Sequence, residues 1–405
     1  MKWFMFLLAI SMCLFVSSER GYTIDTVKGL FYLDGSPVSI HINDGFITQI
    51  SRHNDTEKDQ LKTIVAPGFI DIQINGYAGV DFSGPDLSVV GVRRATKALW
   101  KEGVTSYFPT VITQPHERLL RNFNILAEAS NQDDIGRSIP GFHLEGPYIS
   151  PKDGFRGAHL EKFVRAPDWK ELSEYVRAAD GKIKLFTIAP EVDGAFEMIL
   201  HAISNGMVVA IGHTGADAEQ IERAADAGAT MSTHLGNGCA NMIHRHHNPL
   251  WPQLADDRLS PTLIVDGHHL TRAEVRTFYK VKDPQNIMLI SDALDLAGMP
   301  PGEYMAGGKK VVMTPEGMIK YPEENVLAGA SLPIHRGVHN IMQFTDCSLA
   351  DAVHMASRNQ AMHFDLEDRG ELLPGKRADM VLFTRDDNGI VVEKTILAGE
   401  VVYER

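Results

Sequence analysis

Short apolar segments alternate with longer amphipathic stretches between residues 67 and 369, and this alternation constrains the fold more than any other feature of the sequence. Eight apolar segments predict buried strands, which begin near Phe69, Val104, Gly141, Ile183, Met207, Thr230, Thr262 and Ile287. Helical periodicity separates most of these segments, at residues 87–101, 167–179, 195–205, 216–227 and 271–280. Strands that alternate with helices form a parallel sheet. Eight such units predict an α/β protein in which the sheet closes into a (β/α)8 TIM barrel.

Four of the predicted strands are followed by a side chain that can bind a metal or move a proton, namely Glu145, His213, His234 and Asp292. In a closed barrel the carboxyl ends of all strands meet at one face. A doubly wound open sheet is the structural alternative, but it would not bring these strand ends around one centre. Each residue alone also has a structural explanation, such as a helix cap for Asp292. Their shared position at strand ends favours catalysis.

A carboxylate and two imidazoles with one position open to water are typical of a catalytic metal site. We therefore predict that Glu145, His213 and His234 bind one divalent metal ion. This set of ligands suits zinc first, with iron, cobalt or manganese as alternatives. A carboxylate beside activated water can take its proton and return it to a leaving group, which predicts Asp292 as the general base.

Both ends of the chain show a different pattern, in which short apolar strands are separated by glycine turns. Such strands are expected at residues 30–33, 38–42 and 46–50, and again at residues 378–383, 391–392, 395–397 and 401–403. Chain ends often lie close together at a domain surface. We therefore predict that residues 22–66 and 370–405 form one small β-sandwich domain beside a barrel of residues 67–369.

The first residues are typical of a leader. Met1-Lys2 precedes an apolar run from Trp3 to Val16 and the small residues Ser17-Ser18, which predicts a signal peptide of residues 1–18. The run is shorter than the roughly 20 residues that a spanning helix needs. An uncleaved extension or a misassigned start codon is the alternative. We predict no membrane attachment after leader removal, and the net charge of -13 predicts no nucleic-acid partner. Only two cysteines follow the leader, and we predict no disulfide.

Several motifs resemble those of the amidohydrolase superfamily and, more narrowly, of the N-acetylglucosamine-6-phosphate deacetylases. They are Ala66-Pro67-Gly68-Phe69-Ile70-Asp71, His143-Leu144-Glu145-Gly146-Pro147, Gly212-His213, Thr233-His234-Leu235 and Ser291-Asp292-Ala293. The resemblance extends from about Thr26 to the C-terminus. Many relatives carry a His-x-His pair after the first strand, where this chain has Gln73-Ile74-Asn75. Amides are poor metal ligands beside imidazole, so we expect one metal ion per chain rather than two.

The resemblance implies hydrolysis of the acetamide of a small amino-sugar substrate, N-acetylglucosamine 6-phosphate. It implies that His159 polarises the carbonyl, that Asn237 and Gly238 contact the substrate and that His269 holds the phosphate. Where the family has a phosphate-binding Arg, this chain has His247, and Arg245 is the nearest guanidinium. The resemblance also implies a homodimer, in which residues 237–249 could reach the partner's site. A cytoplasmic location is expected from the family, and a secreted or periplasmic one from the leader.

Other functions stay open. One alternative is a deacetylase of an unphosphorylated N-acetyl amino sugar, or a hydrolase of another acylamino or cyclic amide compound. A non-catalytic sugar-binding protein is a third, which the combination of three metal-type ligands and a general base disfavours. The cluster His244, His246 and His247 is interpreted as a polar loop or substrate rim, with an additional metal site as the alternative.

Overall fold

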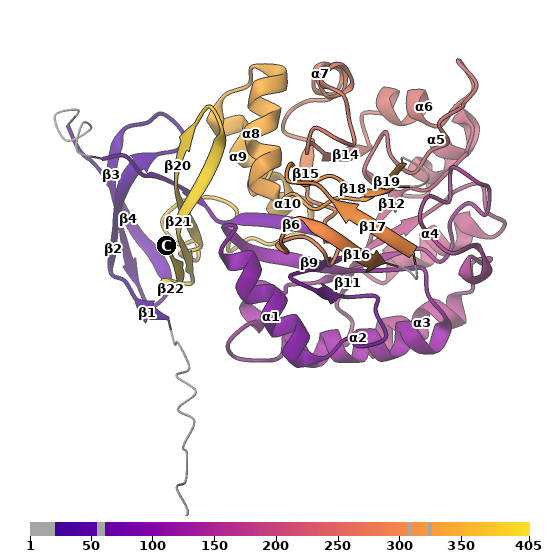
Figure 1. The fold of residues 1–405 in the computed structure, drawn as a ribbon, viewed down its shortest axis with the longest axis horizontal. Coiled ribbons are helices and arrows are strands. Elements are labelled where there is room, and N and C mark those ends of the chain that lie inside the picture. The colour runs from indigo at the N-terminus through magenta and orange to yellow at the C-terminus, as the bar shows by residue number, and fades with distance from the viewer. Residues whose placement is uncertain (1–20, 55–60, 307–308, 323–325) are drawn as a thin grey trace, which may run out of the picture.

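Eight parallel strands form the centre of the molecule (Figure 1). The structure is a computed structural model that describes residues 21–54, 61–306, 309–322 and 326–405. The strands follow one another around the barrel as β6 (Phe69–Ile74), β9 (Val104–Ile112), β10 (Phe142–Glu145), β11 (Ile183–Ile188), β12 (Val208–Ile211), β13 (Met231–Ser232), β14 (Ser260–Ile264) and β15 (Met288–Ile290). These are the eight strands predicted from the sequence, so the TIM barrel is confirmed and the open-sheet alternative is wrong.

Hydrogen bonds join the end of the last barrel strand to the first strand. The backbone N–H of Asp292 donates to the carbonyl oxygen of Gln73 at 2.9 Å, and the N–H of Ser291 donates to Asp71 Oδ1 at 3.2 Å. Asp71 is buried, and burial raises the pKa of its carboxyl to about 7. The closure therefore fixes the backbone on either side of Asp292 against β6.

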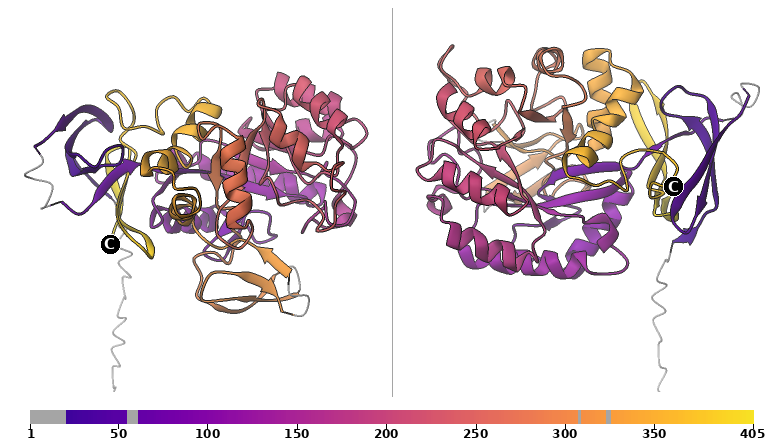
Figure 2. Two further views of the ribbon diagram at one scale, coloured as in Figure 1. Left: turned by 90° about the horizontal axis from the view of Figure 1, so that it is seen from above. Right: turned by 180° about the vertical axis from the view of Figure 1, so that it is seen from behind.

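Helices cover the outside of the barrel (Figures 1 and 2). They are α1 (Val89–Trp100), α2 (His116–Ser130), α3 (Trp169–Ala178), α4 (Ala195–Ser204), α5 (Ala218–Asp226), α6 (Leu250–Ala255), α7 (Arg272–Val281), α8 (Ile334–Thr345), α9 (Leu349–His354) and α10 (Arg358–His363). Capping boxes start two of the predicted ones, with Asp217 and Gln220 at α5 and with Thr271 and Glu274 at α7. Each box satisfies backbone N–H groups that the first helical turn leaves unpaired.

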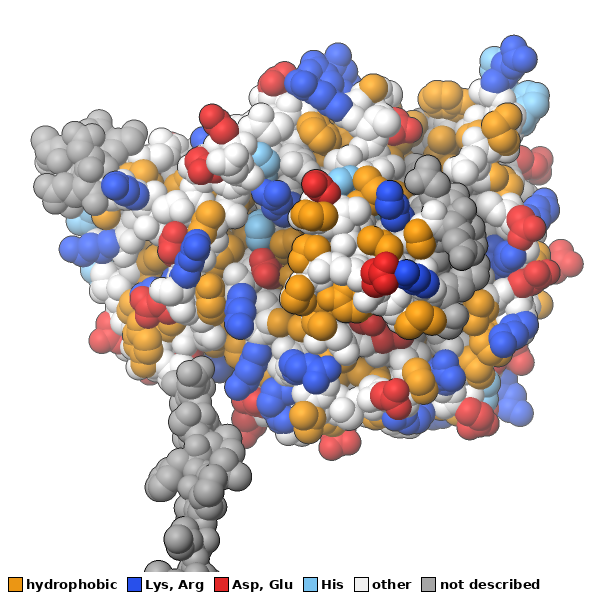
Figure 3. All heavy atoms as spheres, in the orientation of Figure 1, with side chains coloured by type: hydrophobic (Ala, Val, Ile, Leu, Met, Phe, Trp, Pro, Cys, Tyr) orange, Lys and Arg blue, Asp and Glu red, His pale blue; other side chains and the backbone are white. Residues whose placement is uncertain are grey.

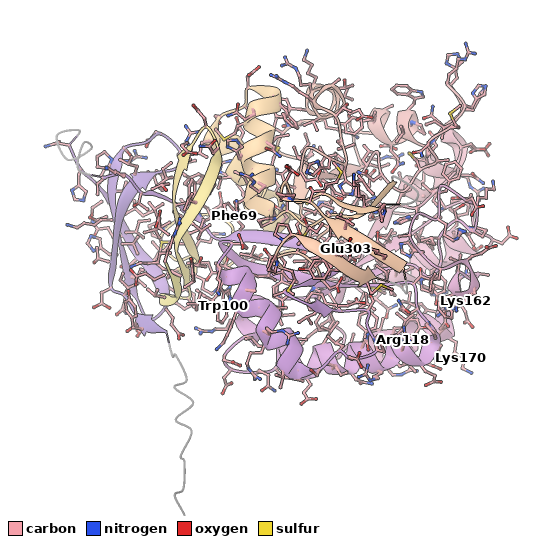
Figure 4. The ribbon with its side chains drawn as sticks, in the orientation of Figure 1. Phe69, Trp100, Arg118, Lys162, Lys170 and Glu303 are labelled. Atoms are coloured by element: carbon pink, nitrogen blue, oxygen red, sulfur yellow. The ribbon has the colours of Figure 1, made fainter. Side chains whose placement is uncertain are left out.

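The two chain ends form one eight-stranded sheet that folds into a small sandwich beside the barrel, as predicted (Figure 1). Its strand order is β1 (Tyr22–Thr23), β22 (Glu400–Glu404), β21 (Gly389–Leu397), β20 (Met380–Asp386), β5 (Ile64–Pro67), β2 (Thr26–Phe31), β3 (Pro37–Asn43) and β4 (Phe46–Arg52). The two short strands expected at residues 391–392 and 395–397 are a single strand, β21. Side chains near Phe69 and Trp100, labelled in Figure 4, join the two domains: the rings of Phe69 and Phe383 lie 6.4 Å apart, and Thr395 Oγ1 donates to the Trp100 carbonyl.

A four-stranded antiparallel sheet between β15 and α8 was not predicted. It consists of β16 (Gly302–Ala306), β17 (Lys309–Met313), β18 (Ile319–Tyr321) and β19 (Val326–Gly329), and it projects from the barrel in the left view of Figure 2. Its core is a small separate cluster of Leu296, Val311, Met313 and Ile319. So few apolar residues, spaced by glycine and charge, give a weak strand signal. The His268 Nε2 atom lies 3.3 Å from the Glu316 carbonyl oxygen and so links this sheet to the segment after β14.

The remaining sequence expectations concern thiols and the membrane. Cys239 and Cys347 are both free and half-buried. Among the described residues, no helix has the length and apolar character needed to cross a bilayer. The predicted signal peptide falls on residues 1–18, outside the described part of the chain.

His363 on α10 should make stability depend on pH. Burial lowers the pKa of this imidazole to about 4, and Thr230 Oγ1 lies 3.1 Å from its Nε2 atom. An unfolded chain would bind this proton near pH 6.5, so the native state loses stability as the pH falls from about 6.5 to about 4. We expect this group to remove about 1–3 kcal/mol of unfolding free energy across that window. Urea unfolding at both ends of the window measures the effect, and His363→Gln should show a shallower pH dependence; identical slopes in both proteins would contradict the assignment.

Candidate active site

Glu145, His213 and His234 converge at the carboxyl ends of β10, β12 and β13. The Nε2 atoms of His213 and His234 lie 3.1 and 3.0 Å from Glu145 Oε1, and 3.1 Å from each other. All three side chains are buried, and their ligand atoms lie within 4.8 Å of one another. Within the described residues they form the one such group of potential metal ligands. The three predicted ligands are therefore brought together.

The polarity of these atoms suits a cation between them. His213 Nδ1 lies 3.1 Å from the carbonyl oxygen of Phe155, which can only accept, so Nδ1 carries a hydrogen and Nε2 is the ring nitrogen available to a metal. The Nε2 atom faces the carboxylate of Glu145. Burial alone would raise the pKa of Glu145, but its contacts with the two imidazoles outweigh burial and hold the pKa well below its usual range. Lone pairs that converge on one point fit a bound metal ion.

The backbone at the strand ends is bent in a way that aims these side chains inward. His213, His234 and Asp292 have φ angles of 49°, 30° and 49°, in the left-handed region that non-glycine residues rarely adopt. Such strain is commonly retained where a functional geometry requires it. Two glycines pack on the imidazoles: a Cβ atom on Gly157 would lie 2.9 Å from His213 Cε1, and one on Gly238 would lie 2.9 Å from His234 Cε1.

Asp292 lies beside the cluster and is held by two amides. Its Oδ1 atom accepts from Asn75 Nδ2 at 2.7 Å and from Gln73 Nε2 at 3.2 Å, and Gln73 Nε2 also lies 3.1 Å from Glu145 Oε1. Burial and, secondly, the charge of Glu145 raise the pKa of Asp292 to about 6. The next element along the chain is the strand β16, so Asp292 caps no helix there. A carboxyl that titrates near neutrality can both accept and return a proton.

His159, from the segment between β10 and α3, reaches the same cluster. Its Nε2 atom lies 3.2 Å from His213 Nε2, and its Nδ1 atom lies 2.7 Å from Thr113 Oγ1. Burial, with the nearby imidazole of His213, lowers the pKa of His159 to about 3, so the ring is neutral at physiological pH. A neutral imidazole in this position can donate a hydrogen bond from one nitrogen only.

Asn237 and Gly238 line a small pocket together with His213, and so lie next to the candidate metal ligands. His269 follows β14 and is oriented by Asp266, whose Oδ2 atom lies 2.7 Å from His269 Nδ1. Asp266 Oδ1 accepts the backbone N–H groups of residues 268 and 269, which fixes this turn. The structure thus gives His269 one defined orientation.

Arg245 lies apart from the cluster. The segment that leads to α6 projects from the barrel, and its tip carries His and Lys or Arg side chains (Figures 1 and 3). Within the described residues, no hydrogen bond or ion pair joins the Arg245 guanidinium to the cluster. His244 Nδ1 accepts the backbone N–H groups of His246 and His247, so this nitrogen stabilises the turn and is not free to bind a metal.

Sequence reasoning missed Thr113 and the donors Gln73 and Asn75 as parts of the site's hydrogen bonding. Thr113 follows β9 directly, much as Glu145 ends β10 and His213 lies two residues after β12. Position at a strand end was therefore the signal that could have found it. A threonine does not attract notice as a catalytic candidate in the way that His or Glu does.

Comparisons with known proteins identify the family of the chain. The model of the amidohydrolase family matches residues 64–402. The N-acetylglucosamine-6-phosphate deacetylase of Bacillus subtilis (strain 168) is 32% identical over 374 residues, covering 90% of this chain and 92% of that protein. The N-acetylgalactosamine-6-phosphate deacetylase of Escherichia coli O157:H7 is 31% identical over 363 residues, covering 89% and 94%.

Solved structures of such enzymes share the fold. The N-acetylglucosamine-6-phosphate deacetylase of Thermotoga maritima superposes with a TM-score of 0.80 at 30% identity, covering 94% of this chain and 100% of that one. A mutant of the Mycobacterium smegmatis enzyme, in complex with N-acetyl-D-glucosamine-6-phosphate, gives a TM-score of 0.78 at 29% identity, covering 90% and 94%.

Proposed function

This chain belongs to the amidohydrolase family and, within it, to the N-acetylglucosamine-6-phosphate deacetylases, and from this membership we propose that it hydrolyses the acetamide of N-acetylglucosamine 6-phosphate. The products are glucosamine 6-phosphate and acetate. The observation that carries the proposal is the convergence of Glu145, His213 and His234 with Asp292 at one end of the barrel.

Glu145, His213 and His234 would hold one divalent metal ion, proposed to be zinc. When bound, the ion supplies Lewis-acid activation of water and of the amide carbonyl. The side-chain amides of Gln73 and Asn75 donate hydrogen bonds to Asp292. Neither residue has the imidazole lone pair that a second ion would need. The Phe155 carbonyl fixes the His213 ring with its Nε2 lone pair toward the ligand group.

Asp292 is the proposed general base and acid. Its Oδ1 atom is occupied by the amides of Gln73 and Asn75, whereas no described residue donates a hydrogen bond to Oδ2. We assign Oδ2 the proton of the attacking water, which it then delivers to the departing amine nitrogen. A carboxyl pKa of about 6 supports both steps.

His159 is proposed to donate from Nε2 to the oxygen of the acetamide carbonyl as negative charge develops there. Asn237 and Gly238 are proposed to contact the sugar, since they adjoin the metal-type ligands. His269, with Nδ1 held by Asp266, is proposed to bind the 6-phosphate. Phosphate oxygens accept strongly from such oriented donors.

A homodimer would bring Arg245 to a substrate. The projecting segment carries Met242, which is 91% exposed, and Trp251 on the adjoining α6 is 53% exposed; such apolar groups are typical of an interface. We propose that it covers the partner's site and supplies Arg245 to the partner's substrate phosphate.

Mixing two variants that are impaired in different ways tests this arrangement. Arg245→Ala should raise KM for the phosphorylated sugar about 10- to 100-fold with little change in kcat, because a charge-assisted phosphate contact is lost. When Arg245→Ala and Asp292→Asn subunits are mixed in equal amounts, each hybrid dimer contains one intact site. At subsaturating substrate, roughly a quarter of all sites in the mixture should therefore regain full kcat/KM. Arg177→Ala on the surface of α3 serves as the control for loss of charge. No recovery in hybrids of demonstrated composition would contradict donation to the partner's site.

Acetate release by the metal-loaded mature protein tests the function itself. N-acetylglucosamine 6-phosphate, N-acetylgalactosamine 6-phosphate and N-acetylglucosamine are compared at matched concentrations. We expect kcat/KM for the first to exceed that for the unphosphorylated sugar by about 100-fold or more. A preference for the unphosphorylated sugar would favour the secreted alternative, and N-terminal sequencing of the exported protein would show whether the leader has been removed after Ser18. Hydrolysis of none of the three would reject the proposal.

A further inference from the structure

Among the described residues, Thr113 is the one whose side chain hydrogen-bonds to Nδ1 of His159, the ring nitrogen that points away from the metal ligands. It lies directly after β9 and is almost fully buried. Its Oγ1 atom lies 2.7 Å from His159 Nδ1. A Cβ atom on Gly146 would lie 2.3 Å from the same Oγ1, so the backbone of Gly146 packs directly against the hydroxyl. The hydroxyl and the imidazole are therefore enclosed together.

The direction of this hydrogen bond follows from counting donors and acceptors. A threonine hydroxyl and a neutral imidazole nitrogen can each either donate or accept. Within the described part of the chain, Thr113 Oγ1 has no hydrogen-bond partner other than His159 Nδ1. If Nδ1–H donated to the hydroxyl, the hydroxyl hydrogen would be buried without an acceptor, which is unfavourable. If the hydroxyl donates to Nδ1, the hydroxyl hydrogen has an acceptor and the ring hydrogen lies on Nε2.

We propose that Thr113 is a positioning residue that donates its hydroxyl hydrogen to His159 Nδ1 and thereby fixes the His159 hydrogen on Nε2, the nitrogen that faces the substrate. The inference rests on the proposed function, because it explains how His159 becomes a donor to the acetamide oxygen. It also explains why His159, only 3.2 Å from His213 Nε2, is not a fourth metal ligand: a protonated nitrogen has no lone pair to offer.

Loss of the hydroxyl frees the ring to place its hydrogen on Nδ1. In Thr113→Val, which preserves the shape of the side chain, the ring would then populate a form that cannot donate from Nε2. Removing one donor to a developing oxyanion typically costs about 10²–10³ in kcat, and partial loss of the correct tautomer should cost about 10- to 100-fold. KM should stay within about threefold, because the donor acts mainly in the transition state.

Three variants and one spectrum test the proposal. Thr113→Val and Thr113→Ser are compared with Thr96→Val, which removes a buried hydroxyl from α1, where Thr96 contacts the Val92 carbonyl and Tyr107. Thr113→Ser should retain kcat to within about threefold, and Thr96→Val should affect stability rather than kcat. Long-range ¹H–¹⁵N spectra of the histidine-labelled, zinc-loaded wild type report the tautomer directly, with His159→Gln used to assign the signal.

The spectrum separates this inference from the proposed function, since it needs neither substrate nor turnover. A His159 hydrogen on Nε2 in the wild type, together with a shift toward Nδ1 in Thr113→Val, is the expected result. A wild-type hydrogen on Nδ1 overturns the inference whatever the activity. Equal kcat values for Thr113→Val and the wild type overturn it as well. A Thr113→Val protein that does not fold leaves the wild-type spectrum as the deciding measurement.

Discussion

Asp292→Asn is expected to lower kcat by about 10²–10⁴ while leaving the metal content unchanged. The variant keeps an oxygen that can accept from Asn75 and Gln73, so the local hydrogen bonds survive. It loses the group that takes and returns the proton. Acetate release and elemental analysis of the same preparation measure the two quantities together.

The control for an Asp→Asn change is Asp217→Asn at the start of α5, because Asn caps a helix about as well as Asp does.

The raised pKa of Asp292 adds a second readout. In the wild type, kcat/KM should fall below about pH 6, where the base becomes protonated; in Asp292→Asn it should not fall in this way. Activity of the variant within about tenfold of the wild type would remove Asp292 from its proposed role.

The barrel was predictable because its evidence is local. Each strand is a short apolar segment, and each following helix has its own periodicity and often its own cap, so no long-range information is needed to recognise a βα unit. Barrel closure then places Glu145, His213, His234 and Asp292 at one face, which is why their position at strand ends was enough to predict that they lie together.

Contacts between distant segments were not predictable in the same way. Asp71 supports the turn at Ser291, and Thr113 contacts His159, but in each case nothing in the local sequence indicates the partner. The sheet β16–β19 illustrates a second limit, since its four short strands are stabilised by only a small apolar cluster. Arg245 illustrates a third limit. Whether this exposed residue contacts a substrate depends on whether a partner subunit packs against it, which the sequence of one chain does not show.

Glu145→Gln should abolish both metal binding and turnover, and the metal-free protein should be stabilised rather than weakened by the change. In the wild type the carboxylate of Glu145 lies 3.1 Å from Nε2 of His213, whose hydrogen is held on Nδ1 by the Phe155 carbonyl, so without the ion a neutral His213 ring would turn a lone pair toward the carboxylate, an unfavourable contact. A glutamine amide can donate to these nitrogens. We expect chelation to lower the melting temperature of the wild type, since it removes a ligand of the native state, and to leave that of Glu145→Gln unchanged.

The matched control for Glu145→Gln is Glu102→Gln, which alters a Glu–His pair outside the site, where His335 Nε2 lies 2.9 Å from Glu102 Oε2. This variant should remain sensitive to chelation and retain kcat. Metal analysis after dialysis should give about one ion per chain for the wild type and for Glu102→Gln, and less than about 0.1 for Glu145→Gln. Two ions per wild-type chain would contradict the inference that Gln73 and Asn75 remove the second site. Full metal content in Glu145→Gln would instead mean that the two imidazoles hold the ion with other partners, so that the carboxylate serves only to orient them.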